Sequence, residues 1–212
     1  MKETYVAENH YQVDQYDSKR RFISYWHQID EIVRSRPRHV LEVGVGSGFL
    51  SRYLKNTGIS LTTCDYDVRL QPDVVARASH IPLPDSSFDT VVAYEVLEHV
   101  PYEESKKALQ EFLRIAKKTV IISIPDQTRV FRVEVPLPWI GKFKKLVVLP
   151  KRKPLHFEPE PFGGHQWEIG VRGYPLEKIM RDIQHIGFLI EKNYRVFEFP
   201  YHHFFVLKKR SS

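Results

Sequence analysis

Short apolar runs alternate along the chain with segments of helical periodicity. The runs at residues 39–43, 60–64, 74–78, 88–94 and 119–124 are rich in β-branched side chains and predict strands. Between them, apolar residues recur every three or four positions in residues 18–35, 49–56 and 102–116, which predicts amphipathic helices. Because strands and helices alternate, we expect an α/β fold built on a parallel sheet.

The alternation stops after the fifth strand and resumes near the end of the chain. We interpret residues 126–174 as an insertion or cap, because long irregular stretches are unusual in compact domains. A helix over 175–186 then leads to two strands, 189–199 and 203–209, which a short turn can join as a hairpin. The length suits a single domain, 1–212, with a helical N-terminal segment in 1–36.

The net charge of +6 comes from one segment. Residues 142–153 hold six basic side chains and no acidic one, and the rest of the chain has 26 basic and 26 acidic residues. Localised positive charge favours an acidic partner or an anionic surface. The alternative is a solvated loop without a partner.

A glycine-rich motif, Glu42-Val-Gly-Val-Gly-Ser-Gly48, lies between the first strand and the next helix. Glycines permit positive φ angles and close backbone approach to a ligand. Asp65 follows Gly44 by 21 residues, at the end of the second strand, where an acid can accept hydrogen bonds from ribose hydroxyls. The third glycine comes one residue earlier than in dinucleotide-binding enzymes, and the preceding glutamate suits a cationic ligand better than a pyrophosphate. A nicotinamide-dependent dehydrogenase is therefore a remote alternative.

These residues, with HIPLPDSSFD at 80–89 and YEVLEHVP at 94–101, resemble the class I S-adenosylmethionine-dependent methyltransferases, in particular the type-11 methyltransferase domain. The resemblance extends to IISIP at 121–125. It implies a Rossmann-like, mostly parallel seven-stranded sheet with helices on both faces and an antiparallel last strand. It also implies S-adenosyl-L-methionine as cofactor and S-adenosyl-L-homocysteine as product.

The resemblance further implies roles for individual residues. Glu42, Gly44, Gly46 and Gly48 would line the methionine end of the cofactor. Asp65 would hold the ribose, Tyr66 would lie against the adenine, and Ala78 and Ser79 would lie near its edge. Glu95 would face the methionine moiety or the acceptor. Arg77 departs from the family, which often has an acid near this position.

Methyl transfer needs alignment above all, and a general base only where the acceptor must lose a proton. We consider His165, Glu95 and His99 as the catalytic candidates. His165 lies in a glycine-flanked loop, which could instead be a packed turn anchored by Trp167. His202 and His203 are expected to be exposed turn residues. We find no spacing typical of a metal site, so no metal is predicted.

The basic segment has its own prediction. Pro138 to Val148 can form a short helix with its apolar side chains in one arc and its lysines outside it. Residues 138–153 would then cover the acceptor pocket, contact an anionic membrane, or pack on the domain.

The predicted function is methyl transfer to a small-molecule or a lipid- or saccharide-linked acceptor. One alternative is RNA methylation with residues 142–153 on the phosphates, which we favour less. Another is a non-catalytic module that binds S-adenosylmethionine. The sequence has no long apolar stretch and a single cysteine, Cys64, which fits a cytoplasmic protein that is peripheral to the membrane if the basic segment binds lipid.

Overall fold

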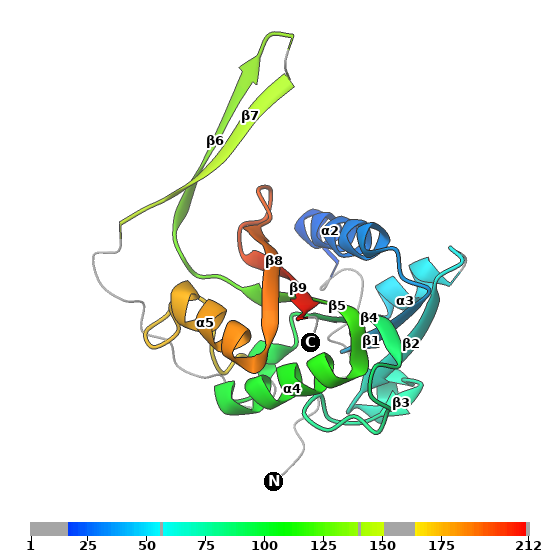
Figure 1. Ribbon diagram of the computed structural model, residues 1–212. Coiled ribbons are helices and arrows are strands. Elements are labelled where there is room, and N and C mark those ends of the chain that lie inside the picture. Colours follow the sequence, from blue (N-terminus) through cyan, green and yellow to red (C-terminus); the bar gives the residue numbers. More distant parts are fainter. Residues whose placement is uncertain (1–16, 56, 140, 151–163, 211–212) are drawn as a thin grey trace.

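A computed structural model of the protein describes residues 17–55, 57–139, 141–150 and 164–210 (Figure 1). Its centre is a seven-stranded sheet in the order β3-β2-β1-β4-β5-β9-β8. The strands in that order are β3 (Val74–Val75), β2 (Ser60–Asp65), β1 (His39–Val43), β4 (Phe88–Tyr94), β5 (Ala116–Pro125), β9 (His202–Lys209) and β8 (Phe188–Arg195). Only β9 runs antiparallel to its neighbours, β5 and β8. The expected Rossmann-like sheet is confirmed.

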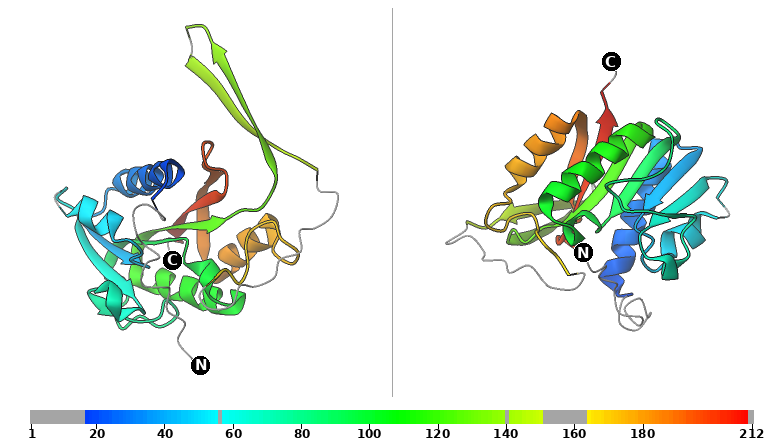
Figure 2. Two further views of the ribbon diagram at one scale, coloured as in Figure 1. Left: turned by 180° about the vertical axis from the view of Figure 1, so that it is seen from behind. Right: turned by 90° about the horizontal axis from the view of Figure 1, so that it is seen from below.

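Helices cover both faces of the sheet, as the alternating pattern predicted (Figure 2). α2 (Lys19–Ser35) and α3 (Phe49–Leu54) lie on one face, and α4 (Tyr102–Ile115) and α5 (Leu176–Ile186) lie on the other. The sheet separates two hydrophobic cores, and two adjacent residues of β9 contribute one side chain to each. Phe204 packs on the side of α2, and Phe205 packs on the side of α4. Both side chains are fully buried, as expected for successive positions of a strand covered on both faces.

Local signals set the element ends. Ser18 caps α2, because its hydroxyl oxygen accepts a hydrogen bond from the backbone N–H of Arg21 at 3.3 Å. β3 is shorter than the predicted 74–78, since only Val74 and Val75 pair with β2. A 3₁₀ turn, η1 (Val68–Leu70), stands where a crossover helix usually connects parallel strands.

The prediction of a helix over Pro138 to Val148 is wrong. This segment belongs to a β-hairpin of β6 (Val130–Leu137) and β7 (Gly141–Val148), which projects from the domain (Figure 1). The reason is the preceding segment, whose valines alternate with polar residues and supply a partner strand for the apolar positions of β7. Residues 151–153 of the basic segment lie outside the described residues.

Over the part of the chain that the structure describes, no helix has the length and apolar character needed to cross a membrane.

Candidate functional site

The glycine turn lies between the ends of β1 and β2. The N–H of Gly44 donates to the carbonyl of Cys64 at 2.8 Å, which joins the turn to β2. Gly44 has a φ of +86°, and a Cβ built on it would lie 2.3 Å from the Cγ2 atom of Val96. Only glycine fits here, because any side chain would meet both backbone strain and a packed neighbour. Gly48, at φ +69°, caps α3.

Asp65 ends β2 directly beside this turn. Its carboxylate accepts hydrogen bonds from the backbone N–H groups of Val45 at 2.8 Å and Asp67 at 2.9 Å. Burial raises the pKa of Asp65, and these hydrogen bonds act in the opposite direction. Each carboxylate oxygen has a second lone pair, so the group can accept further hydrogen bonds from a ligand.

Glu42, on β1, is a buried acid. Its side chain is 5% exposed, and its Oε2 atom has no hydrogen-bond partner among the described residues. Burial and then the charge of Asp65 raise the pKa of Glu42 to about 8. A buried polar atom without a partner costs about 1–3 kcal/mol. Glu42 is therefore suited to a cationic ligand that would supply the missing interaction.

Glu42 and the glycine turn line one narrow cleft of about 40 Å³. Arg21, Tyr25 and Gln28 of α2 line one side of the cleft, and Glu42 and Glu95 line the other. The cleft lies at the carboxyl ends of β1 and β4, where the strand order of the sheet reverses. In open α/β sheets this switch point is where ligands bind.

Glu95 follows β4 and has an unusual backbone. Its φ of +54° is rare for a residue other than glycine, and strain of this kind is concentrated at functional sites. Burial raises the pKa of Glu95 to about 7. Its Oε2 atom lies 3.5 Å from Nε2 of His202.

The two terminal histidines are not exposed turn residues, so that prediction is wrong. Both are buried because they begin β9, which lies between β5 and β8 in the sheet. Nδ1 of His202 lies 2.7 Å from the hydroxyl oxygen of Ser24, and burial lowers its pKa to about 3, so the ring is neutral. Nδ1 of His203 lies 3.0 Å from a carboxylate oxygen of Asp126, away from the cleft residues.

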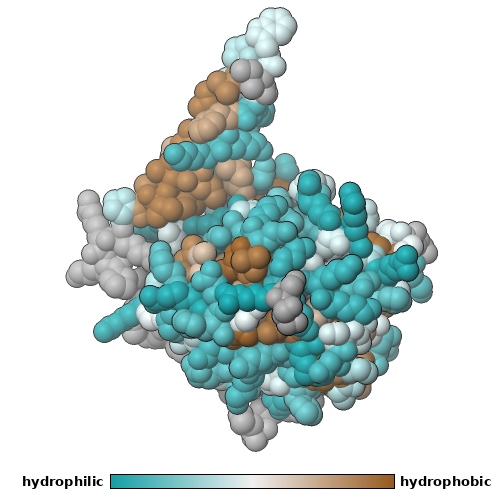
Figure 3. Space-filling view, viewed as in Figure 1, coloured by the Kyte–Doolittle hydropathy of each residue, from teal (hydrophilic) through white to brown (hydrophobic). Residues whose placement is uncertain are grey.

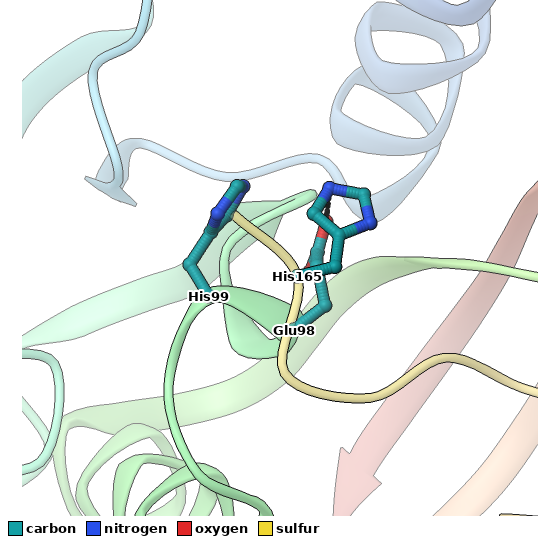
Figure 4. Close-up of side chains that lie close together, drawn as sticks. All are labelled: Glu98, His99 and His165. Carbon is teal, nitrogen blue, oxygen red and sulfur yellow. Dashed lines mark ion pairs between the residues drawn. The ribbon is translucent and has the colours of Figure 1, made fainter. Parts of the chain in front are cut away.

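A second cluster lies where the loop of His165 packs on the turn after Glu95 (Figure 4). The indole N–H of Trp167 donates to the carbonyls of Leu97 and Val100, both at 3.1 Å. This anchor brings His165 beside Glu98 and His99, with the two histidine ring centroids 4.8 Å apart. The loop is therefore a turn anchored by Trp167, and the catalytic role of His165 stays a prediction.

Known proteins resemble this chain in sequence over residues 41–124 and in fold over most of its length. Residues 41–124 match the family model of the methyltransferase domain. Over these residues the chain is similar to a methyltransferase domain. A probable S-adenosylmethionine-dependent methyltransferase of Mycolicibacterium smegmatis is 31% identical over 93 residues, which are 36% of this chain and 36% of that protein. The chain thus spans about a third of this relative's length.

Solved structures show the same fold as the methyltransferase domain. A protein of Pyrococcus horikoshii aligns with a TM-score of 0.63 at 14% identity, over 95% of this chain and 96% of its own. A glycopeptide N-methyltransferase in complex with S-adenosyl-L-homocysteine aligns with a TM-score of 0.59 at 12% identity, over 87% of this chain and 89% of its own.

The fold brings most of the predicted cofactor residues together. Glu42, Gly44, Gly46 and Glu95 line the cleft, and Asp65 bonds to its backbone at Val45. Tyr66 is partly exposed beside Asp65. Ala78 packs against the core, and Ser79 is half-buried beyond β3, so their predicted adenine contacts stay predictions.

Sequence reasoning missed the contribution of α2. Arg21, Tyr25 and Gln28 occur at helical spacing and face the cleft, and Ser24 holds His202. The signal was present, because Ser24 and Gln28 are polar residues on the side of α2 that carries the buried Ile32. Polar positions on a core-facing helix side often mark a site.

Proposed function

We propose that this chain transfers a methyl group from S-adenosylmethionine to a small-molecule or a lipid- or saccharide-linked acceptor. The observation that carries the proposal is the pair of buried acids, Glu42 and Asp65, on adjacent strands around the glycine turn. Oε2 of Glu42 has no partner among the described residues, and a ligand with an ammonium group would satisfy it. The solved glycopeptide N-methyltransferase, which has this fold, binds S-adenosyl-L-homocysteine.

The residues divide the work in a simple way. Asp65 would accept hydrogen bonds from the ribose hydroxyls, and Glu42 would face the methionine ammonium group. The cofactor supplies an already activated methyl group, so the protein's main contribution is alignment, worth up to about 7–11 kcal/mol in favourable cases. Glu95, with its pKa raised to about 7 by burial, would take a proton from the acceptor near neutral pH.

Binding and turnover experiments test this function. We expect calorimetric titration to show one S-adenosylmethionine bound per chain. A hydrolase-coupled assay should then detect S-adenosylhomocysteine only when an acceptor pool is added, with metabolites, lipid extract and RNA as separate pools. A chain that ignores S-adenosylmethionine contradicts the proposal. Binding without turnover on any pool would favour the non-catalytic alternative, and turnover on RNA alone would favour the RNA alternative.

The hairpin of β6 and β7 favours a lipid-linked acceptor. Its pairing places Phe131 opposite Val147 and Val135 opposite Phe143, on one face of the ribbon. All four side chains are exposed, as is Trp139 at the tip, and Figure 3 shows apolar surface over the hairpin. Exposed apolar surface of this extent marks an interaction site.

The other face of the hairpin turns toward the domain. Arg132 donates to the backbone carbonyl of Glu198 at 3.1 Å, and Lys144 donates to its carboxylate at 2.6 Å. The apolar face therefore points outward and carries Lys145, which pairs with Val133 on the same face. Apolar and aromatic side chains beside a lysine suit the surface of an anionic bilayer.

We expect the protein to sediment with phosphatidylserine vesicles and not with phosphatidylcholine vesicles. The triple variant Lys142→Glu, Lys144→Glu, Lys145→Glu should bind at least about tenfold more weakly, since a lysine near the surface contributes about 1 kcal/mol and Lys145, on the apolar face, reverses its charge. A matched control reverses Lys107, Lys117 and Lys118, which lie on α4 and β5. Equal and negligible sedimentation of all three proteins removes the membrane contact.

A further inference from the structure

Glu98 is a buried acid that the methyl-transfer proposal does not use. Its side chain is fully buried in the turn after Glu95. Neither Oε1 nor Oε2 accepts a hydrogen bond from any described residue. Burial, and then the charge of Glu95, raise the pKa of Glu98 well above its usual range. A carboxyl group in this position is costly unless a ligand completes its contacts.

His165 is held with one ring nitrogen turned toward Glu98. Its Nδ1 lies 2.5 Å from Oε1 of Glu168, and the hydroxyl of Tyr201 donates to the same oxygen at 2.8 Å. Its Nε2 lies 4.0 Å from Oε1 of Glu98. A histidine that binds a metal through one nitrogen almost always donates a hydrogen bond from the other to a carboxylate, carbonyl or water. Glu168 stands in the position of such a carboxylate.

His99 completes a group of three potential ligands. One donor atom from each of Glu98, His99 and His165 lies within 4.8 Å of the others (Figure 4). Donor atoms that bind a tetrahedral ion at about 2.1 Å lie about 3.4 Å from one another. Side-chain rotations that move each donor atom by about 1 Å would therefore bring the three atoms to binding distance. His99 is exposed and His165 partly exposed, which gives an ion a path from solvent.

We infer that Glu98, His99 and His165 bind one divalent first-row transition-metal ion. Two imidazoles and a carboxylate are the ligand set of many catalytic zinc sites, which leave a further position open. The two imidazoles disfavour Mg²⁺ and Ca²⁺, which prefer ligands that are all oxygen. Sequence spacing does not indicate this site, because the third ligand, His165, comes close only through the packing of Trp167.

The position of the site suggests its use. Glu98 and His99 belong to the same turn as Glu95, which lines the cleft. An ion here would lie near the acceptor, where it could bind and orient an acceptor oxygen. This last step rests on the proposed methyl transfer, whereas the binding of the ion does not.

Titration calorimetry with Zn²⁺ on the full chain, first stripped with a chelator, tests the inference. We expect one ion per chain in the parent protein, and a Kd raised at least about tenfold in both His165→Ala and Glu98→Gln. The positioning variant Glu168→Gln should raise the Kd by about 10–100-fold. His185→Ala, which removes an exposed histidine of α5, is the matched control and should bind as the parent does.

Spectroscopy and cofactor binding separate the possible failures. Co²⁺ in place of Zn²⁺ should give visible absorption bands in the parent that disappear in His165→Ala. Thermal unfolding and binding of S-adenosylhomocysteine, measured on every variant, verify folding without using the metal. A parent chain that binds S-adenosylhomocysteine but not Zn²⁺ overturns the metal site alone. Unchanged Zn²⁺ binding by His165→Ala overturns it too, as does tighter binding of Mg²⁺ than of Zn²⁺.

Discussion

Replacing Asp65 by asparagine is expected to weaken the binding of S-adenosylhomocysteine by about a hundredfold. The carboxylate ends β2 beside the glycine turn and has lone pairs left for the ribose. Hydrogen bonds to a charged group contribute about 1.5–3 kcal/mol each, and a loss of about 2.7 kcal/mol corresponds to a hundredfold change in Kd. Asparagine keeps the size but only one acceptor oxygen, so the variant loses the charge together with the hydrogen bond from the backbone N–H of either Val45 or Asp67. Titration calorimetry measures it.

Asp73→Asn is the control for this variant. Asp73 accepts hydrogen bonds from the N–H and the hydroxyl of Thr63, both at 2.8 Å, and so supports the same strand without facing the glycine turn. We expect its cofactor affinity to match that of the parent. An affinity of Asp65→Asn within about threefold of the parent would refute the role of this carboxylate, provided that thermal unfolding shows both variants folded.

The pH dependence of cofactor binding is the second large effect, and it centres on Glu42. Its pKa of about 8 in the free protein means that the carboxyl is mostly protonated at pH 7. A cationic ligand favours the ionised form, so binding lowers this pKa and releases a proton. Affinity for S-adenosylmethionine should therefore rise by up to about tenfold per pH unit below this pKa and level off above it.

The free energy of unfolding of the cofactor-free protein should fall as the pH rises, whereas the cofactor affinity rises. Between the usual pKa of 4.5 and the raised value of about 8, the folded state binds more protons at Glu42 than the unfolded state does. Stability therefore falls as the pH rises through this window. Thermal unfolding at several pH values, with and without cofactor, measures both trends.

Glu95 titrates in the same range and needs its own variant. Burial raises its pKa to about 7, so the parent can release protons from two acids. Calorimetry in two buffers of different ionisation enthalpy counts these protons. We expect Glu42→Gln to remove most of the release and Glu95→Gln to remove less. An unchanged count in Glu42→Gln would show that this carboxyl does not face the cationic end of the ligand.

The sheet and the glycine site could be predicted because their signals are local. The strand before Gly44, the helix after it and the spacing to Asp65 all lie within one βαβ unit, where sequence distance and spatial neighbourhood agree. The hairpin could not be predicted in the same way. Its apolar residues fit a helical arc over a short window, and the choice between helix and strand depended on pairing with residues 130–137.

The cluster around Glu98 depended on tertiary packing that no spacing reveals. His165 comes from a loop remote in sequence from His99, and it is in place because Trp167 bonds to the carbonyls on either side of that turn. The burial of His202 has the same cause, since β9 lies between β5 and β8 and is not an edge strand. Long-range contacts of this kind carry no periodic signal.

The close approach of Val96 to Gly44 couples the evolution of the glycine turn to that of the turn after Glu95. Val96 lies between Glu95 and Glu98, and its methyl group fills the space that a side chain at position 44 would need. A substitution that changes the size of the side chain at position 96 would therefore alter the packing against the glycine turn as well. Substitutions at these two positions should be inherited together, and changes of acceptor specificity would more readily arise in the loop of His165 or in the hairpin, which leave this contact undisturbed.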